Sequence, residues 1–290
     1  MIFTNLEVMI KCLLIGFDSD IEKYAFVLSQ SLYFQEPDSF LLDTSECFDG
    51  VFSDHEKYHA FLLVSKIDDP LSLFIEFMKA GKNLYFVDQE GFTANDLPLL
   101  VNMFEESGSL LYPEIKELHR PLFEDFITVD PSRMHYSYTK SLASRKDIRT
   151  ALISALGLLS LLSPVPVKKI DVSTIETTSL GRPAIKVRLK MYDSSVCFIL
   201  LDIDNMNDYF VEIESSKGKF HFNVAENYIE NQTGDKFYSD IMTDDGLLLR
   251  TIDAFAMNII MNSKPSFSFL HYLTCVGLIL KIENILKNSL

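Results

Sequence analysis

Several histidines and acidic residues have types and spacing that could support a chemical reaction or bind a metal ion. His55 and His59 stand four residues apart, with Asp54 and Glu56 beside them. Two imidazoles at this spacing on a helix can hold a metal ion, but no third ligand is apparent in the sequence. An exposed helix carrying histidine is therefore the preferred interpretation, and no metal site is assigned.

A second group of reactive side chains lies within one segment, Tyr112-Pro-Glu-Ile-Lys-Glu-Leu-His-Arg120. Its hydroxyl, carboxylate, amine and imidazole groups could move protons or position a substrate. A solvated linker into a second domain would have the same composition. We keep as candidate cleft residues Asp88, which follows a buried strand, and Tyr112, Glu114, Lys116 and His119.

Composition narrows the classes of function. With 26 basic and 41 acidic residues the net charge is −15, which argues against a nucleic-acid partner. The most apolar run, Ala151 to Leu162, is too short to cross a bilayer, which needs about 20 residues. Four scattered cysteines suit a reducing compartment, and no signal peptide is recognised. We therefore expect a cytoplasmic protein with no membrane partner.

Strands and helices alternate in the N-terminal half, which predicts an α/β fold with a Rossmann-like parallel sheet. Expected strands lie at 9–15, 40–42, 60–64, 84–87 and 109–112, and expected helices at 21–32, 70–79 and 94–107. The boundary of this domain is placed at residue 122, so that the two predicted domains cover residues 1–122 and 123–290.

The pattern of the C-terminal half of the sequence predicts an α+β domain. This domain should contain a large, mostly antiparallel open sheet with helices on one face. Successive strands at 168–176, 182–192, 196–202, 209–215 and 219–224 have short polar connections. A basic row at Lys186, Arg188 and Lys190 accompanies an acidic row at Glu212 and Glu214. These rows could pair across strands, face solvent or form an oligomer contact. We expect a homodimer or higher homo-oligomer through this sheet.

The order of several elements resembles the Gfo/Idh/MocA oxidoreductases, the family of glucose–fructose oxidoreductase and inositol dehydrogenase. The resemblance rests on Leu13-Leu-Ile-Gly16, on the helix 71–79 running into Ala80-Gly-Lys82, and on the helix before Ser107-Gly108. It also rests on the long helix ending at Leu161-Leu-Ser163 and on the turn at Lys264-Pro265. The resemblance implies a nucleotide-binding Rossmann domain, an NAD or NADP cofactor, and a sugar or polyol-like small molecule as substrate.

The dinucleotide fingerprint of that family is only partly present. Gly16 matches its first glycine, but the second position holds Asp18 and the third holds Ile21. A carboxylate at Asp18 would repel the pyrophosphate, and Asp20 adds to this charge. Asp43 is placed to hydrogen-bond a ribose. The residues assigned to cofactor binding are Gly16, Phe17, Asp18, Asp43, Ser65 and Lys66.

The family's catalytic residues are missing at the matching positions. Its Glu-Lys-Pro motif corresponds to Val87-Asp88-Gln89, and its aspartate and histidine should fall within Arg149 to Ser154, where neither occurs. No catalytic residue is therefore assigned. Two hypotheses remain: an NAD(P)-dependent oxidoreductase with diverged motifs, and a catalytically inactive relative that binds a small ligand or a partner protein.

Overall fold

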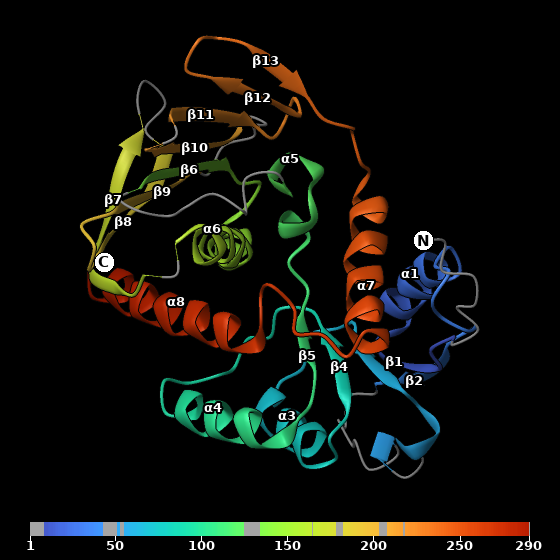
Figure 1. Ribbon diagram of the computed structural model, residues 1–290. Coiled ribbons are helices and arrows are strands. Elements are labelled where there is room, and N and C mark those ends of the chain that lie inside the picture. The colour runs from blue at the N-terminus through green and yellow to red at the C-terminus, as the bar shows by residue number, and fades with distance from the viewer. Residues whose placement is uncertain are drawn as a thin grey trace. The chain divides into compact units, whose positions relative to one another are not determined.

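The computed structural model describes residues 9–42, 51–52, 55–124, 134–163, 165–177, 182–202, 208–216 and 218–289 (Figure 1). Contacts divide the chain into two compact units. The first unit consists of Met1–Lys116 and Thr243–Leu273, and the second of Glu117–Met242 and Thr274–Leu290. The first unit thus takes in a segment that follows the whole second sheet in sequence.

A five-stranded parallel sheet forms the centre of the first unit, in the order β2-β1-β3-β4-β5. Helices α1 and α7 cover one face, and α3 and α4 cover the other (Figure 1). The strands are β1 (Cys12–Gly16), β2 (Asp38–Leu41), β3 (Ala60–Leu63), β4 (Asn83–Phe86) and β5 (Leu111–Pro113). The helices are α1 (Asp18–Leu28), α3 (Pro70–Lys79), α4 (Asp96–Ser107) and α7 (Asp244–Ile260), followed by the start of α8 (Phe269–Ser289).

Local sequence explains these elements. All four residues of β3 are buried, as expected for a strand covered by helices on both faces. Helix α3 begins after Asp69, whose carboxylate accepts the backbone N–H of Ser72, and has Pro70 at its first position. It ends before Gly81, whose φ of 62° is a left-handed conformation that glycine adopts without strain. The predicted turn between this helix and β4 is therefore confirmed.

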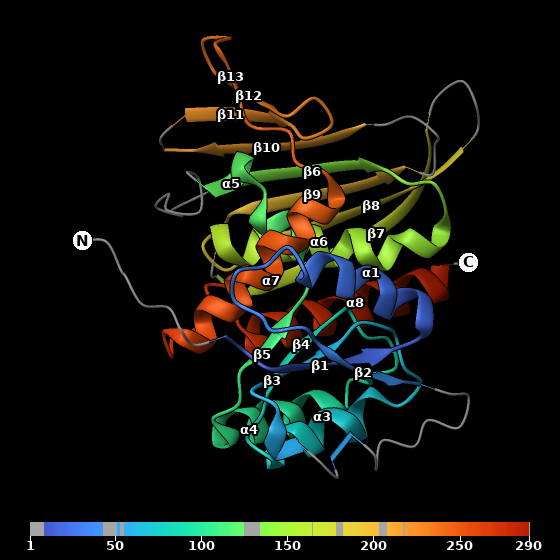
Figure 2. The same ribbon diagram turned by 90° about the vertical axis from the view of Figure 1, so that its right-hand side faces the viewer.

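The second unit contains an eight-stranded sheet in the order β13-β12-β11-β10-β6-β9-β8-β7 (Figure 2). The β6–β9 pair is parallel and the other pairs are antiparallel, so the predicted mostly antiparallel sheet is confirmed. Its strands are β6 (His135–Ser141), β7 (Val167–Thr177), β8 (Arg182–Met191), β9 (Val196–Asp202), β10 (Tyr209–Ser215), β11 (Gly218–Asn223), β12 (Tyr228–Asn231) and β13 (Lys236–Tyr238).

Helix α6 (Ile148–Leu162) packs on one face of this sheet, against β6 and β9. The hydroxyl of Tyr136 in β6 donates to the carbonyl of Ala155 in the helix at 3.3 Å. Short 3-10 and α-helical turns precede the sheet and this helix: η2 (Lys116–His119), α5 (Pro121–Glu124) and η3 (Arg145–Asp147).

One helix among the described residues is long and apolar enough to cross a membrane by length and composition alone, at Phe269–Lys287 in α8. The core helix of a soluble protein meets the same criterion. Phe269, Tyr272, Cys275, Val276 and Ile279 of this helix are fully buried in the protein. Of the most apolar 18-residue window of this helix, 39% is buried inside the protein.

Candidate functional site at the carboxyl edge of the parallel sheet

The candidate site lies where the parallel strands of the first unit end. From β1 the chain continues to β2 on one side, and then to β3 on the other side. In open α/β sheets, ligands bind at the carboxyl ends of strands where the strand order reverses in this way. Gly16 at the end of β1 and Ser65 after β3 flank this point.

Gly16 allows the ends of β1 and β3 to approach closely. A Cβ atom at this position would lie 2.7 Å from Ser65 Oγ and 2.7 Å from Val64 Cγ2. Real Cβ atoms essentially never show contacts this short. The protein's own side chains therefore occupy the space that this glycine leaves.

Ser65 joins the end of β3 to the turn between β1 and α1. Its buried hydroxyl accepts the backbone N–H of Phe17 at 2.9 Å and donates to Asp20 Oδ2 at 2.5 Å. Phe17 is the residue before α1, and Asp20 lies in the first turn of that helix. The structure thus brings together Gly16, Phe17 and Ser65, three of the predicted cofactor residues, and they contact one another.

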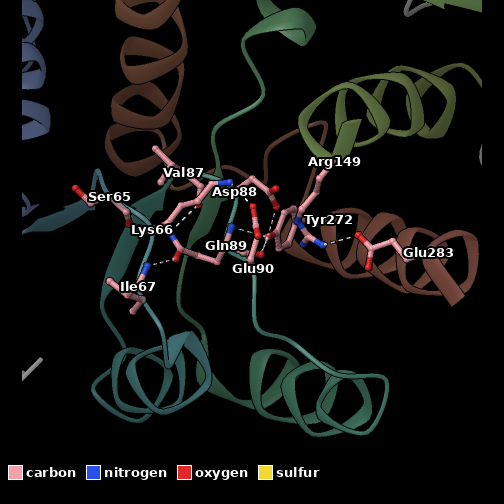
Figure 3. A network of polar contacts seen from close by, with 10 residues as sticks. All are labelled: Ser65, Lys66, Ile67, Val87, Asp88, Gln89, Glu90, Arg149, Tyr272 and Glu283. Atoms are coloured by element: carbon pink, nitrogen blue, oxygen red, sulfur yellow. Dashed lines mark hydrogen bonds and ion pairs between the residues drawn. The ribbon is translucent and has the colours of Figure 1, made fainter. Parts of the chain in front are cut away.

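Gln89 extends this network to the next strand (Figure 3). The side chain is fully buried, and its Nε2 donates to the carbonyls of Ser65 and Val87, each at 3.0 Å. Its Oε1 accepts the N–H of Ile67 at 3.1 Å. The loops that follow β3 and β4 are consequently held together by one amide side chain.

Asp88, which the sequence resemblance matches to the family's lysine, is hydrogen-bonded within this network. The hydroxyl of Tyr272, in the first turns of α8, donates to Asp88 Oδ1 at 2.8 Å and accepts the backbone N–H of Gln89 at 3.2 Å. Asp88 is 9% exposed and Tyr272 is fully buried. Sequence reasoning missed Tyr272 because it lies 184 residues from Asp88 and no local pattern connects the two.

Lys66 and Asp18 are exposed at the surface of the first unit. The Lys66 ammonium pairs with Glu90 at 2.5 Å, with both side chains at least half exposed. Asp18 begins α1 and adds a second carboxylate to its first turn. Asp43, the predicted ribose partner, lies outside the described residues.

Glu114 occupies a second polar cluster just after β5. Its Oε2 accepts hydrogen bonds from the hydroxyl of Tyr24 in α1 and from the hydroxyl of Tyr85 in β4. The second of these bonds is 2.8 Å long. Lys116 Nζ lies 3.5 Å from the other carboxylate oxygen. Burial first, and then the Glu114 charge, raise the pKa of both tyrosines well above the ordinary value. The hydroxyls therefore stay protonated as donors and do not exchange protons near neutral pH.

The predicted cleft residues are divided between several environments. Tyr112 is buried and its ring stacks on Tyr85 with centroids 6.0 Å apart, so it belongs to the core. Glu114 and Lys116 form the ion pair described above, while Asp88 belongs to the Tyr272 network. His119 ends η2 and falls in the second unit.

The turn between β1 and α1 differs in two respects from an open pyrophosphate-binding turn. Pyrophosphate binding needs free N–H donors and positive potential at the start of the helix. Here the N–H of Phe17 is bonded to Ser65, and two carboxylates stand in the first turn. The carboxylates of Asp18 and Asp20 make the potential at this helix start less favourable for an anion.

Residues 149–154, which the sequence resemblance matches to the family's catalytic segment, contain neither aspartate nor histidine. Residues 149–154 form the first turns of α6, in which Ala151, Leu152, Ile153 and Ser154 are buried. The Ser154 hydroxyl donates to the carbonyl of Thr150, and Arg149 lies 3.9 Å from Glu283. No metal-binding group of His, Cys, Asp and Glu occurs among the described residues.

Comparison with solved structures identifies the architecture. UDP-N-acetylglucosamine 3-dehydrogenase from Acidithiobacillus ferrooxidans superposes with a TM-score of 0.75 at 12% identity, covering 95% of this chain and 97% of that one. Biliverdin reductase from Synechocystis, in complex with biliverdin and NADP+, gives 0.70 at 12% identity over 95% and 98%. Myo-inositol 2-dehydrogenase from Lactobacillus plantarum gives 0.68 at 12% identity over 96% and 98%.

No protein-family model and no curated protein matches the sequence. The likeness is therefore one of structure, and it spans both units and nearly the full length of each neighbour. The resemblance noted in the sequence is confirmed at this level: the chain has the fold of the Gfo/Idh/MocA-type dehydrogenases.

Proposed function

We propose that this chain is a catalytically inactive relative of the NAD(P)-dependent oxidoreductases, which keeps their fold to bind a small ligand or a partner protein. The observation that carries the proposal is the Ser65 bridge. Its hydroxyl uses the Phe17 N–H and binds the Asp20 carboxylate at the point where a dinucleotide phosphate would bind. Both effects disfavour a dinucleotide at this turn.

The environment of Asp88 supports the same proposal. Hydride transfer from a carbinol requires a group that removes a proton near neutral pH. Asp88 stands where the resemblance places a lysine, and its carboxylate is held by the buried Tyr272 hydroxyl. A buried, hydrogen-bonded carboxylate in a braced loop is suited to holding the loop in place.

The second candidate function is that of an NAD(P)-dependent oxidoreductase, with a sugar or polyol-like molecule as its substrate. The similarity to dehydrogenases and to a reductase solved with NADP+ favours it, as does the close approach at Gly16. These neighbours act on a nucleotide sugar, a polyol and biliverdin, so the fold alone does not specify a substrate.

Titration of the protein with NADH and with NADPH, followed by fluorescence and calorimetry, separates the two functions. We expect no binding at millimolar cofactor. A dissociation constant below about 100 μM, roughly −5.5 kcal/mol, would contradict the proposal and support the oxidoreductase. Absence of binding at millimolar concentrations would exclude the oxidoreductase.

A charge variant tests the cause of the weak binding. Asp18→Gly combined with Asp20→Asn removes both carboxylates, while the asparagine oxygen can still accept the Ser65 hydroxyl. Each charge at a helix N-terminus contributes about 0.3–1 kcal/mol, so affinity for NADH should rise about 3- to 30-fold. Glu22→Gln, an exposed site further along α1, is the matched control and should leave affinity unchanged. A double variant that binds NADH no better than the wild-type protein would show that the two carboxylates do not cause the weak binding.

A further inference from the structure

A cavity lies at the amino-terminal edge of the parallel sheet, the edge opposite the candidate site. Its volume is about 620 Å³, and its walls include Asn83 at the start of β4 and Leu111 at the start of β5. All of its lining residues belong to the first unit. Binding sites for small molecules have volumes of about 300–1,000 Å³. This cavity, called the amino-edge cavity below, therefore has room for a small organic molecule.

The ends of three helices contribute to the wall of the amino-edge cavity. Helix α4 ends at Ser107, next to Gly108 in the wall, and α7 ends just after Ile259, which also lines the cavity. Helix α8 begins in the wall at Phe269. Carbonyl groups give a helix C-terminus a partial negative charge, and N–H groups give an N-terminus a partial positive charge. The last turns of α4 and α7 contain no basic residue, so the cavity wall includes regions of both signs.

Two charged side chains add to these opposite regions. Glu105, in the last turn of α4, and Lys264, in the connection between α7 and α8, both line the cavity and are exposed. Within the part of the chain that the structure describes, neither side chain forms an ion pair, with the other or with a third residue. One carboxylate and one ammonium group are therefore available to a ligand that carries both charges.

The same wall contains apolar side chains. Phe104, Leu110 and Ile259 line the cavity, and each of them is only partly buried. The Phe104 ring packs against the buried ring of Phe269, with centroids 5.1 Å apart. A ligand with an apolar group would remove this surface from water, which is favourable in proportion to the area covered.

We propose that the amino-edge cavity binds an amino acid with an apolar side chain, in its zwitterionic form. Its ammonium group binds near Glu105 and the C-terminal ends of α4 and α7. Its carboxylate binds near Lys264 and the first turn of α8, and its side chain covers the apolar wall. A ligand of one charge would match only one of the two regions. The cavity shares no residue with the Ser65 network, so binding here is independent of the result with NADH.

Calorimetric titration of the full-length protein with L-phenylalanine tests the site. Two analogues dissect the two charges, because phenethylamine lacks the carboxylate and hydrocinnamate lacks the ammonium group. We expect L-phenylalanine to bind with a dissociation constant of about 1 mM or below, and each analogue to bind at least about threefold more weakly. No binding at about 10 mM L-phenylalanine would overturn the proposal, as would an analogue that binds as tightly as the amino acid.

Charge reversals assign the two ends of the ligand. Lys264→Glu should weaken L-phenylalanine and hydrocinnamate at least about threefold without weakening phenethylamine. Glu105→Lys should weaken L-phenylalanine and phenethylamine to a similar extent without weakening hydrocinnamate. Unchanged affinities in both variants would overturn the site. The opposite selectivity, or equal loss of all three ligands, would overturn the assignment of the charges.

Matched controls separate these local effects from changes in net charge or folding. Glu106→Lys reverses an exposed charge beside Glu105 that does not line the cavity, and Lys23→Glu does the same on α1. Each should change the affinity for L-phenylalanine by less than about twofold, because exposed distant charges are screened by salt. Circular dichroism should show that every variant is folded, and Lys264→Gln and Glu105→Gln repeat the test if a charge reversal disturbs the fold.

Discussion

At the scale of single residues, Ser65 links three segments of the candidate site. Its hydroxyl joins the turn after β1 to the first turn of α1, and its carbonyl accepts from Gln89. Ser65→Ala would leave the Phe17 N–H and the Asp20 carboxylate without this partner. We expect a loss of about 1–3 kcal/mol in the free energy of unfolding, measured by urea denaturation, because unsatisfied polar groups are costly.

The matched control for this variant is Ser19→Ala in the same turn. Ser19 is exposed, and the substitution should change stability by less than about 0.5 kcal/mol. Equal effects of the two substitutions would show that the Ser65 bridge contributes nothing to stability. A gain in NADH affinity for Ser65→Ala would in addition indicate that the bridge competes with the cofactor.

Residue types and spacing predicted the place of the site better than its contacts. Phe17 and Ser65 were assigned to cofactor binding, and they follow β1 and β3, which end at the same edge of the sheet. They lie together, but they bond to each other. The decisive partner, Tyr272, comes from the far end of the chain, and a pairing across such a separation depends on the tertiary fold.

At the scale of elements, strong apolar patterns gave reliable predictions and weak ones did not. β9 and β10 have the predicted bounds, because β9 is a continuous apolar run and apolar and acidic residues alternate in the second half of β10. β12 and β13 follow the last predicted strand, 219–224, and the sequence pattern did not predict them. These strands are four and three residues long at the edge of the sheet, where backbone pairing decides the structure.

The first turn of α8 contains an element-scale pH effect at His271. Nδ1 of this half-buried ring accepts the backbone N–H of Ser268 at 3.0 Å, which requires the neutral form. Desolvation lowers the pKa of His271 below its ordinary value of 6.5. The unfolded chain therefore binds the proton more readily, so His271 contributes stability above about pH 6.5 that is lost as the pH falls towards the folded pKa.

Urea unfolding at about pH 7.5 and about pH 5 checks this sign, with His271→Gln as the comparison. The wild-type protein should lose more stability on acidification than the variant, which carries no titrating group at this position. The other groups titrate in both proteins, so the difference between the two curves isolates His271. Parallel curves would contradict the assignment.

At the scale of the whole molecule, the first unit is discontinuous in sequence. Leu248, Ile252 and Phe255 of α7 are fully buried in the core that also contains Tyr24 and Tyr85. Burying three such side chains contributes about 5–9 kcal/mol. The total stability of a domain is only about 5–15 kcal/mol. The parallel sheet therefore depends on residues that follow the second sheet.

We expect a fragment of residues 1–122, which ends at the boundary predicted from sequence, to lack a cooperative thermal transition by circular dichroism. It should bind a hydrophobic dye, because the face that α7 covers would be exposed. A fragment in which residues 1–116 are joined to 243–273 by a flexible linker contains the whole first unit and should unfold cooperatively. Cooperative unfolding of the shorter fragment would show that α7 is dispensable, and that the sheet and its remaining helices bury enough apolar surface to fold alone.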